Sequence, residues 1–328
     1  MPFILRRLVF YLVAAWVALT INFFIPRAMP GNAVQSVMAK FPNLQPSAYK
    51  ALEALLGVGH PGSIWSQYVA YLNDIFHFNF GTDVSQYPAQ VSSLLVQTLP
   101  WTITLVGTAT VIAFLVGTAL GIVAGWRHGG TLDRVLPGLM FLQAIPYFFF
   151  ALILVEVLAV NTHVFPTGQG YDNGLIPGWH WDFISSALYH SLLPALTIVL
   201  TSIAGWMLQM RNVMITTIGE DYVIAAQAKG LPNRRVIFTY AARNALLPQL
   251  QGFGLAVGFV ISGALVMEIV FSYPGIGLLL LNAVTSNDYP LMQAIFLVIT
   301  FAVLLANLVV DMIIVVADPR ARRMEATS

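Results

Sequence analysis

The chain has 328 residues, of which 58% are hydrophobic and only 9% are charged, whereas about 25% of residues are charged in a typical soluble domain. A water-soluble fold could not bury so much apolar surface, and the net charge of +1 gives no basic excess for binding nucleic acid. The absence of cysteine excludes disulfides, thiolate metal sites and cysteine nucleophiles. We therefore predict an all-α membrane protein.

Long apolar runs recur along the chain, each long enough to cross the hydrocarbon core of a membrane as a helix. They predict six transmembrane helices in a single membrane domain over residues 1–328. The predicted spans are 8–26, 100–125, 135–160, 191–210, 247–270 and 291–317. No small-x-small cleavage site follows the first run, so we predict that it is an uncleaved anchor and not a signal peptide.

Lysine and arginine concentrate on one side of this topology. Of the 15, only Arg27, Lys40 and Lys50 fall in predicted external segments. The rest lie near the chain ends and in the loops at 126–134 and 211–246. Because cationic loops are retained on the cytoplasmic side, we predict that both termini and these two loops are cytoplasmic.

Two predicted external segments carry aromatic residues. In the segment 27–98, Trp65, Tyr68 and Tyr71 recur at helical spacing, which predicts an amphipathic helix that lies on the outer surface or packs under the bundle. The loop at 161–190 contains Tyr171, Trp179 and Trp181. Aromatic residues at this depth usually form an interfacial belt, and contact with a transported solute is the alternative.

The 211–246 loop is long for a connection between membrane helices. Asp221 begins a stretch in which small residues lead to Lys229 and Gly230, and Pro232 follows. An acidic start and a glycine-then-proline end are typical of a short helix. Since proline is tolerated in the first turn of a helix, Pro232 can begin a second helix. The loop therefore predicts a helix-turn-helix at the membrane surface.

This loop resembles the EAA-type coupling loop of binding-protein-dependent ABC importer permeases. Ala225-Ala226-x-x-x-Gly230 stands where that motif has its paired alanines and glycine, although Ile224 replaces the motif's Glu. The distance from Gly230 to Leu247-Pro248 is also longer than in the sugar permeases. Both departures fit the dipeptide, oligopeptide and nickel branch. The turn Phe271-Ser272-Tyr273-Pro274-Gly275 resembles the B-type subunit of that branch.

The resemblance implies a type I ABC importer permease fold with a cytoplasmic coupling helix. It also implies four kinds of partner: a second similar permease, two cytoplasmic ATPase domains that carry ATP and Mg, an external solute-binding protein, and membrane lipid. None of the three lysines follows a glycine, so the chain has no Walker A loop, and we expect neither enzyme activity nor a bound cofactor. The residues expected to contact the ATPases are Asp221, Ala225, Ala226, Lys229, Gly230, Leu231 and Arg234.

Translocation-path residues are harder to predict. Glu268 lies near the outer end of a predicted span, and a charge at the centre of a bilayer costs about 2.5–3.5 kcal/mol on insertion scales, so such residues usually face an aqueous path or a partner. The turn that contains Tyr273 follows directly. We take Glu268, Tyr273, Trp179 and Trp181 as candidates for the path, with solvation at the membrane surface as the alternative for Glu268.

The predicted solute is a dipeptide or oligopeptide, and oligosaccharides or a nickel chelate remain open. An ion-coupled secondary transporter is the alternative from another class, but it should show inverted repeats and ionisable groups at mid-membrane, and neither is apparent. A membrane enzyme would need a nucleophile or a metal cluster that the sequence does not offer. Glycines at 252, 254 and 258 predict close helix packing.

Overall fold

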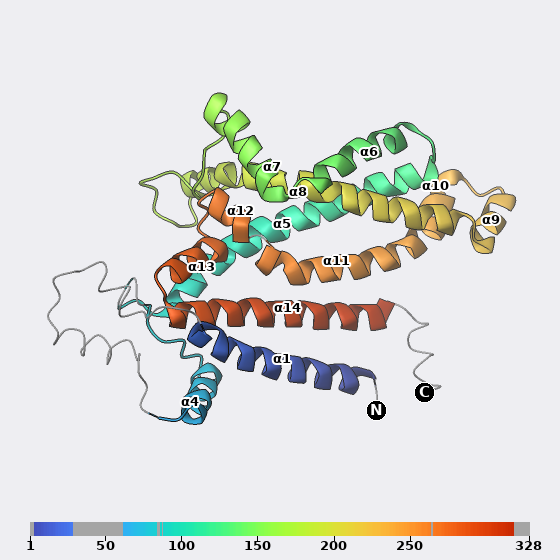
Figure 1. Cartoon of the computed structure of the whole chain (residues 1–328). Coiled ribbons are helices and arrows are strands. Elements are labelled where there is room, and N and C mark those ends of the chain that lie inside the picture. The colour runs from blue at the N-terminus through green and yellow to red at the C-terminus, as the bar shows by residue number, and fades with distance from the viewer. Residues whose placement is uncertain (1–2, 29–61, 84–85, 87, 264, 318–328) are drawn as a thin grey trace. The chain divides into compact units, whose positions relative to one another are not determined.

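The computed structural model describes residues 3–28, 62–83, 86, 88–263 and 265–317, and Figure 1 shows their helices in chain order. Within these ranges there is no β-strand, only an isolated antiparallel bridge between Thr82 and Gln90. The all-α prediction is confirmed. The chain divides into two compact units: unit 1 is Met1–Thr102 with Pro274–Leu304, and unit 2 is Ile103–Tyr273 with Leu305–Ser328. The single-domain organisation stays a prediction.

Four helices in the described part of the chain are long and apolar enough to cross a membrane. They are α1 (Phe3–Ala28), α5 (Val91–Trp126), α8 (Trp181–Ile218) and α14 (Tyr289–Ala317). A fifth crossing is formed if α6 (Thr131–Ala144) is counted together with α7 (Tyr147–Leu154) and η1 (Val155–Asn161). Four or five candidate spans are therefore present.

The fifth predicted span, 247–270, falls on α11 (Arg243–Gly263) and α12 (Leu265–Val270). Neither helix meets the length and composition of a spanning helix among the described residues. Position 264 between them lies outside those residues, as do 29–61 of the predicted external segment 27–98. The count of six spans stays a prediction.

The span predicted at 135–160 is broken. α6 and α7 meet at an angle of 95°, and the break lies at Ile145 and Pro146. Ile145 has an extended backbone (ψ 127°), because the ring of a following proline clashes with the helical conformation of the residue before it. The apolar run continues through this point, so hydropathy alone predicted one straight helix.

α8 is much longer than the predicted span 191–210. Its 38 residues extend about 57 Å at about 1.5 Å per residue, well beyond a hydrocarbon core of about 30 Å. Trp181 and Arg211, which we predicted in loops, lie within this helix. The prediction ended at the limits of the apolar run, whereas the helix continues through polar residues at both ends.

In unit 1, α4 (Ile64–Phe76) lies where the sequence predicts the amphipathic helix. Its inner face packs on α1: the Thr20 and Tyr68 hydroxyls lie 2.7 Å apart, and the Phe23 ring packs against those of Tyr68 and Tyr71. Another face of α4 leaves large apolar side chains exposed, with Trp65 at 71%. One face of α4 is therefore packed on α1 and another is exposed, and its placement on the outer surface stays a prediction.

In unit 2, α5 and α8 approach each other closely at three glycines spaced four apart. A Cβ atom at Gly117 would lie 2.6 Å from the Trp206 Cβ, one at Gly121 would lie 2.6 Å from the Met207 carbonyl oxygen, and one at Gly125 would lie 2.5 Å from the Met214 Cβ. No side chain fits at such distances. The glycines therefore allow the two backbones to pack directly, as small residues do in membrane helices.

Candidate functional site

A short helix, α9 (Asp221–Ala228), follows the end of α8 directly. Its limits agree with the helix predicted from the sequence. Asp221 lies in the first turn, where a negative charge interacts favourably with the helix dipole. Val223 and Ala226 are buried, whereas Asp221 and Ala225 are exposed. The helix therefore has one face packed on the protein and the other open.

Gly230 ends α9 in a Schellman motif. Its backbone N–H donates to the Gln227 carbonyl at 2.8 Å, and the Leu231 N–H donates to the Ala226 carbonyl at 3.4 Å. This motif needs a left-handed residue, and Gly230 has φ +70°. Leu231 packs against the same buried cluster as Ala226. The glycine is required by its backbone conformation and not by lack of space, since a Cβ atom at this position would meet no other atom within 4 Å.

The second predicted helix does not end inside the loop. It begins after Pro232 as α10 (Asn233–Arg235), continues as the π-helix η2 (Val236–Ala242) and joins α11 without a break. The second half of the predicted 211–246 loop is therefore helical and continues directly into α11. π-helical stretches are rare and often occur at functional sites.

A buried apolar cluster fixes α9 to the longer helices. It joins α9 and η2 to α5 and α8 within unit 2, and its members are almost completely inaccessible to solvent. The cluster consists of Ile122, Met210, Met214, Val223, Ala226, Val236, Ala241, Ala242 and Ala245. Because these side chains share one core, α9 is packed against the ends of two candidate spans.

Apolar and cationic side chains are both exposed in the same region. Tyr222 is 40% exposed, Ile224 is 50% exposed and Phe238 is 61% exposed. Lys229, Arg234 and Arg235 are also exposed, and Figure 1 shows α9 and α10 at the same end of unit 2. Apolar side chains clustered with charges on a polar loop are typical of a surface that binds another protein.

Asp133 lies at the centre of a charged cluster, which the sequence did not predict. Its carboxylate accepts from the Arg211 guanidinium, with Nη2 at 3.0 Å, and from the Gly129 N–H at 2.8 Å. His128 Nδ1 lies 2.8 Å away. Arg211, followed by the Gly129 N–H, holds the pKa of Asp133 well below its usual range. The cluster ties the start of α6 to α8. The only sequence signal for this cluster was that Asp133 is an acidic residue in the first turn of a helix.

Glu268 and Tyr273 lie near the opposite end of unit 2 and are fully buried. The Tyr273 N–H donates to the Glu268 carbonyl at 2.7 Å, and the Tyr273 hydroxyl lies 3.0 Å from Ser191 Oγ of α8. Trp179 is 99% exposed and Trp181 is 75% exposed. The structure thus brings Glu268 and Tyr273 together in the protein interior, while the two tryptophans face outward.

Residues 117–323 match the protein family described as "Binding-protein-dependent transport system inner membrane component". The oligopeptide transport system permease protein AppB of Bacillus subtilis (strain 168) is 30% identical, over 92% of each chain. The dipeptide transport system permease protein DppB of Escherichia coli (strain K12) is 31% identical, over 98% of this chain and 99% of the relative. The same-named protein of Lactococcus lactis (strain MG1363) is 27% identical. The family predicted from the Ala225 to Gly230 motif is confirmed, and this chain belongs to the binding-protein-dependent transport system inner membrane components.

Proposed function

We propose that this chain is the permease subunit of an ATP-driven importer that carries dipeptides or oligopeptides across the inner membrane by alternating access. Relatives named as dipeptide and oligopeptide permeases align over nearly its whole length. In this proposal the chain makes six crossings with both termini in the cytoplasm. An external solute-binding protein delivers the peptide, and a second similar permease completes the channel.

The observation that carries the proposal is the surface of α9 and α10. Two cytoplasmic ATPase domains, which hold ATP and Mg, bind this surface and displace it as they close. Exposed Tyr222 and Ile224 supply apolar contact, while Lys229 and Arg234 pair with acidic residues of the ATPase. Val223 and Ala226 on the buried face pass the displacement to α5 and α8, because all of them share one core.

The orientation is supported by how unit 2 distributes its charges. The cationic residues described in this unit gather near the end that carries α9, since the α5–α6 connection, the end of α8 and the start of α11 meet there. They are Arg127, Arg134, Arg211, Lys229, Arg234, Arg235 and Arg243. The positive-inside rule assigns this end to the cytoplasm.

Reconstitution tests the proposal. The chain is purified from its native membrane in mild detergent, co-purifying proteins are identified by mass spectrometry, and the complex is placed in proteoliposomes with labelled dipeptide and the binding protein. We expect uptake that requires ATP, together with recovery of a second permease and at least one ATPase. Uptake driven by an ion gradient without ATP would instead establish a secondary transporter.

A matched pair of variants tests the role of α9. Ile224→Ser alters the exposed face and should reduce ATP-driven uptake without lowering the thermal stability of the purified chain. Val223→Ser alters the buried face and should lower stability by about 2–3 kcal/mol, because a polar side chain replaces a buried apolar one. Full uptake by Ile224→Ser would show that α9 does not bind the ATPase in this way.

A further inference from the structure

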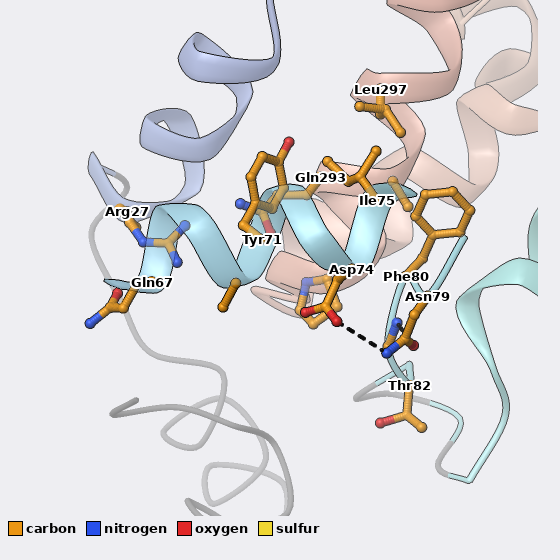
Figure 2. Close-up of a pocket in the computed structure, with 14 residues that line it drawn as sticks. Arg27, Gln67, Tyr71, Asp74, Ile75, Asn79, Phe80, Thr82, Gln293 and Leu297 are labelled. Atoms are coloured by element: carbon orange, nitrogen blue, oxygen red, sulfur yellow. Dashed lines mark hydrogen bonds between the residues drawn. The ribbon is translucent and has the colours of Figure 1, made fainter. Parts of the chain in front are cut away.

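Unit 1 contains a pocket of about 290 Å³ that the proposed transport mechanism does not use. It lies between the end of α1, one side of α4, the segment 79–82 and the start of α14. Figure 2 shows the side chains that line it. Its volume is at the lower limit for small-molecule sites, which range from about 300 to 1,000 Å³. The pocket therefore suits a small polar group better than an extended peptide.

The lining of the pocket combines one positive and one negative side chain. Arg27 donates one Nη–H to the Phe23 carbonyl at 2.8 Å, and its guanidinium carbon lies 3.6 Å from the centroid of the Phe23 ring. Burial lowers its pKa. The carboxylate of Asp74, which is also in the lining, accepts only a long hydrogen bond of 3.4 Å from the Asn79 side chain among the described interactions (Figure 2). No ion pair joins Arg27 to Asp74 in the described part of the chain.

Neutral hydrogen-bonding groups lie in the same lining. Gln67 and Gln293 can donate or accept, and so can the Tyr71 hydroxyl. Asn22 already donates to the Tyr71 oxygen at 3.0 Å, which leaves the hydroxyl proton of Tyr71 available. A ligand that carries a negative group and an ammonium group would satisfy both charged side chains and would use the neutral groups between them.

The position of the pocket indicates the depth of such a ligand in the membrane. Arg27 lies two residues after the candidate span Arg6–Ile25. On α4, Trp65, Val69 and Phe76 are exposed apolar side chains, and aromatic residues of this kind lie at the level of the lipid headgroups. Since Gln67 and Asp74 of the same helix line the pocket, the pocket opens at headgroup depth.

We propose that this pocket binds the headgroup of phosphatidylethanolamine, with its phosphate at Arg27 and its primary ammonium at Asp74. Arginine binds phosphate through several N–H donors at once, and a primary ammonium offers three N–H donors to a carboxylate. A free zwitterion such as a short peptide has the same pair of charges, but it has no acyl chains to hold it at this depth. The apolar wall formed by Ala294 and Leu297 of α14 accommodates the start of an acyl chain.

Native mass spectrometry of the delipidated full-length chain, with any co-purified partners, tests the proposal. Phosphatidylethanolamine, its N-methylated series up to phosphatidylcholine, and phosphatidylglycerol are titrated separately. For the wild type, we expect phosphatidylcholine to bind about tenfold more weakly than phosphatidylethanolamine, because a trimethylated nitrogen cannot donate the charge-assisted hydrogen bond. This comparison uses lipids alone and does not depend on how any variant folds.

Two variants separate the roles of the charges. Arg27→Gln should weaken the binding of phosphatidylethanolamine and of phosphatidylcholine equally, by about tenfold. Asp74→Asn should abolish the difference in affinity between these two lipids, because the primary ammonium then has no carboxylate to which it can donate. Arg127→Gln and Asp182→Asn, which change exposed residues of unit 2, are the matched controls and should leave binding unchanged.

Three results would overturn the proposal. The first is equal binding of phosphatidylethanolamine and phosphatidylcholine by the wild type. The second is discrimination that persists in Asp74→Asn. The third is displacement of the bound lipid by a free dipeptide at a similar concentration, which would make this a solute site. Lipid binding is measured without ATP or transport, so its failure is distinguishable from failure of the proposed import function.

Discussion

Replacing Gly230 tests whether the end of α9 depends on backbone conformation or on space. Gly230 has φ +70°, and a Cβ atom there would meet nothing within 4 Å. The cost of alanine is therefore the cost of a left-handed backbone, about 1–2 kcal/mol. Asparagine tolerates this conformation better, whereas β-branched valine does not. We expect the loss of α9 stability to increase in the order Gly230→Asn, Gly230→Ala, Gly230→Val.

Amide hydrogen exchange of the full-length chain in nanodiscs measures this effect. A loss of about 1–2 kcal/mol should speed exchange of the α9 amides by about 5- to 30-fold in Gly230→Ala. Gly219→Ala is the matched control, because Gly219 has φ −78° and its Cβ would lie 3.5 Å from the Thr216 carbonyl oxygen, an ordinary contact. Unchanged exchange in Gly230→Ala, or exchange as fast in Asn as in Val, would refute this reasoning.

Three further predictions concern contacts within unit 2. Gly121→Ala should lower the free energy of unfolding, measured by thermal unfolding, by about 1–3 kcal/mol through overpacking. Gly138→Ala is the control and should cost far less, because a Cβ atom there would lie in open space. Tyr273→Phe should cost about 1 kcal/mol for the lost hydrogen bond to Ser191, as measured by thermal unfolding. The pKa of Asp133 is lowered, so its stabilising contribution is present above an unfolded pKa of about 3.9 and is lost as pH falls through the folded value. Asp133→Asn should therefore lower the stability measured by thermal unfolding at neutral pH.

The sequence predicted the features that depend on local pattern. The limits of α9 follow from the acidic residue at its start and from Gly230, which together define a helix of eight residues. The amphipathic helix α4 follows from aromatic residues at helical spacing. The family follows from the motif that contains Ala225, Ala226 and Gly230. In each case the signal lies within about a dozen neighbouring residues, where propensity and capping decide the structure.

The features that the sequence did not predict depend on contacts between distant segments. Asp133 and Arg211 are 78 residues apart, and nothing in either neighbourhood specifies the other. Glycines 252, 254 and 258 predicted a packing face, and a Cβ at Gly252 would lie 3.1 Å from Gln209 Nε2, but the close approach of α5 to α8 at Gly117, Gly121 and Gly125 was not predicted. Small residues spaced four apart permit close packing, but which helix they meet is decided by the tertiary fold.

The contacts of α9 determine how a displacement applied to it would travel. Val223 and Ala226 share a core with Met210 and Met214 of α8, so α9 cannot shift alone without opening a cavity there. α8 is in turn held against α5 at three glycines and against α6 through Asp133 and Arg211. We therefore expect α8 to move as one rigid helix with these neighbours. Ser191 lies in the same helix, about 19 residues before Met210 and so farther from α9. It would then carry the displacement to its contact with Tyr273.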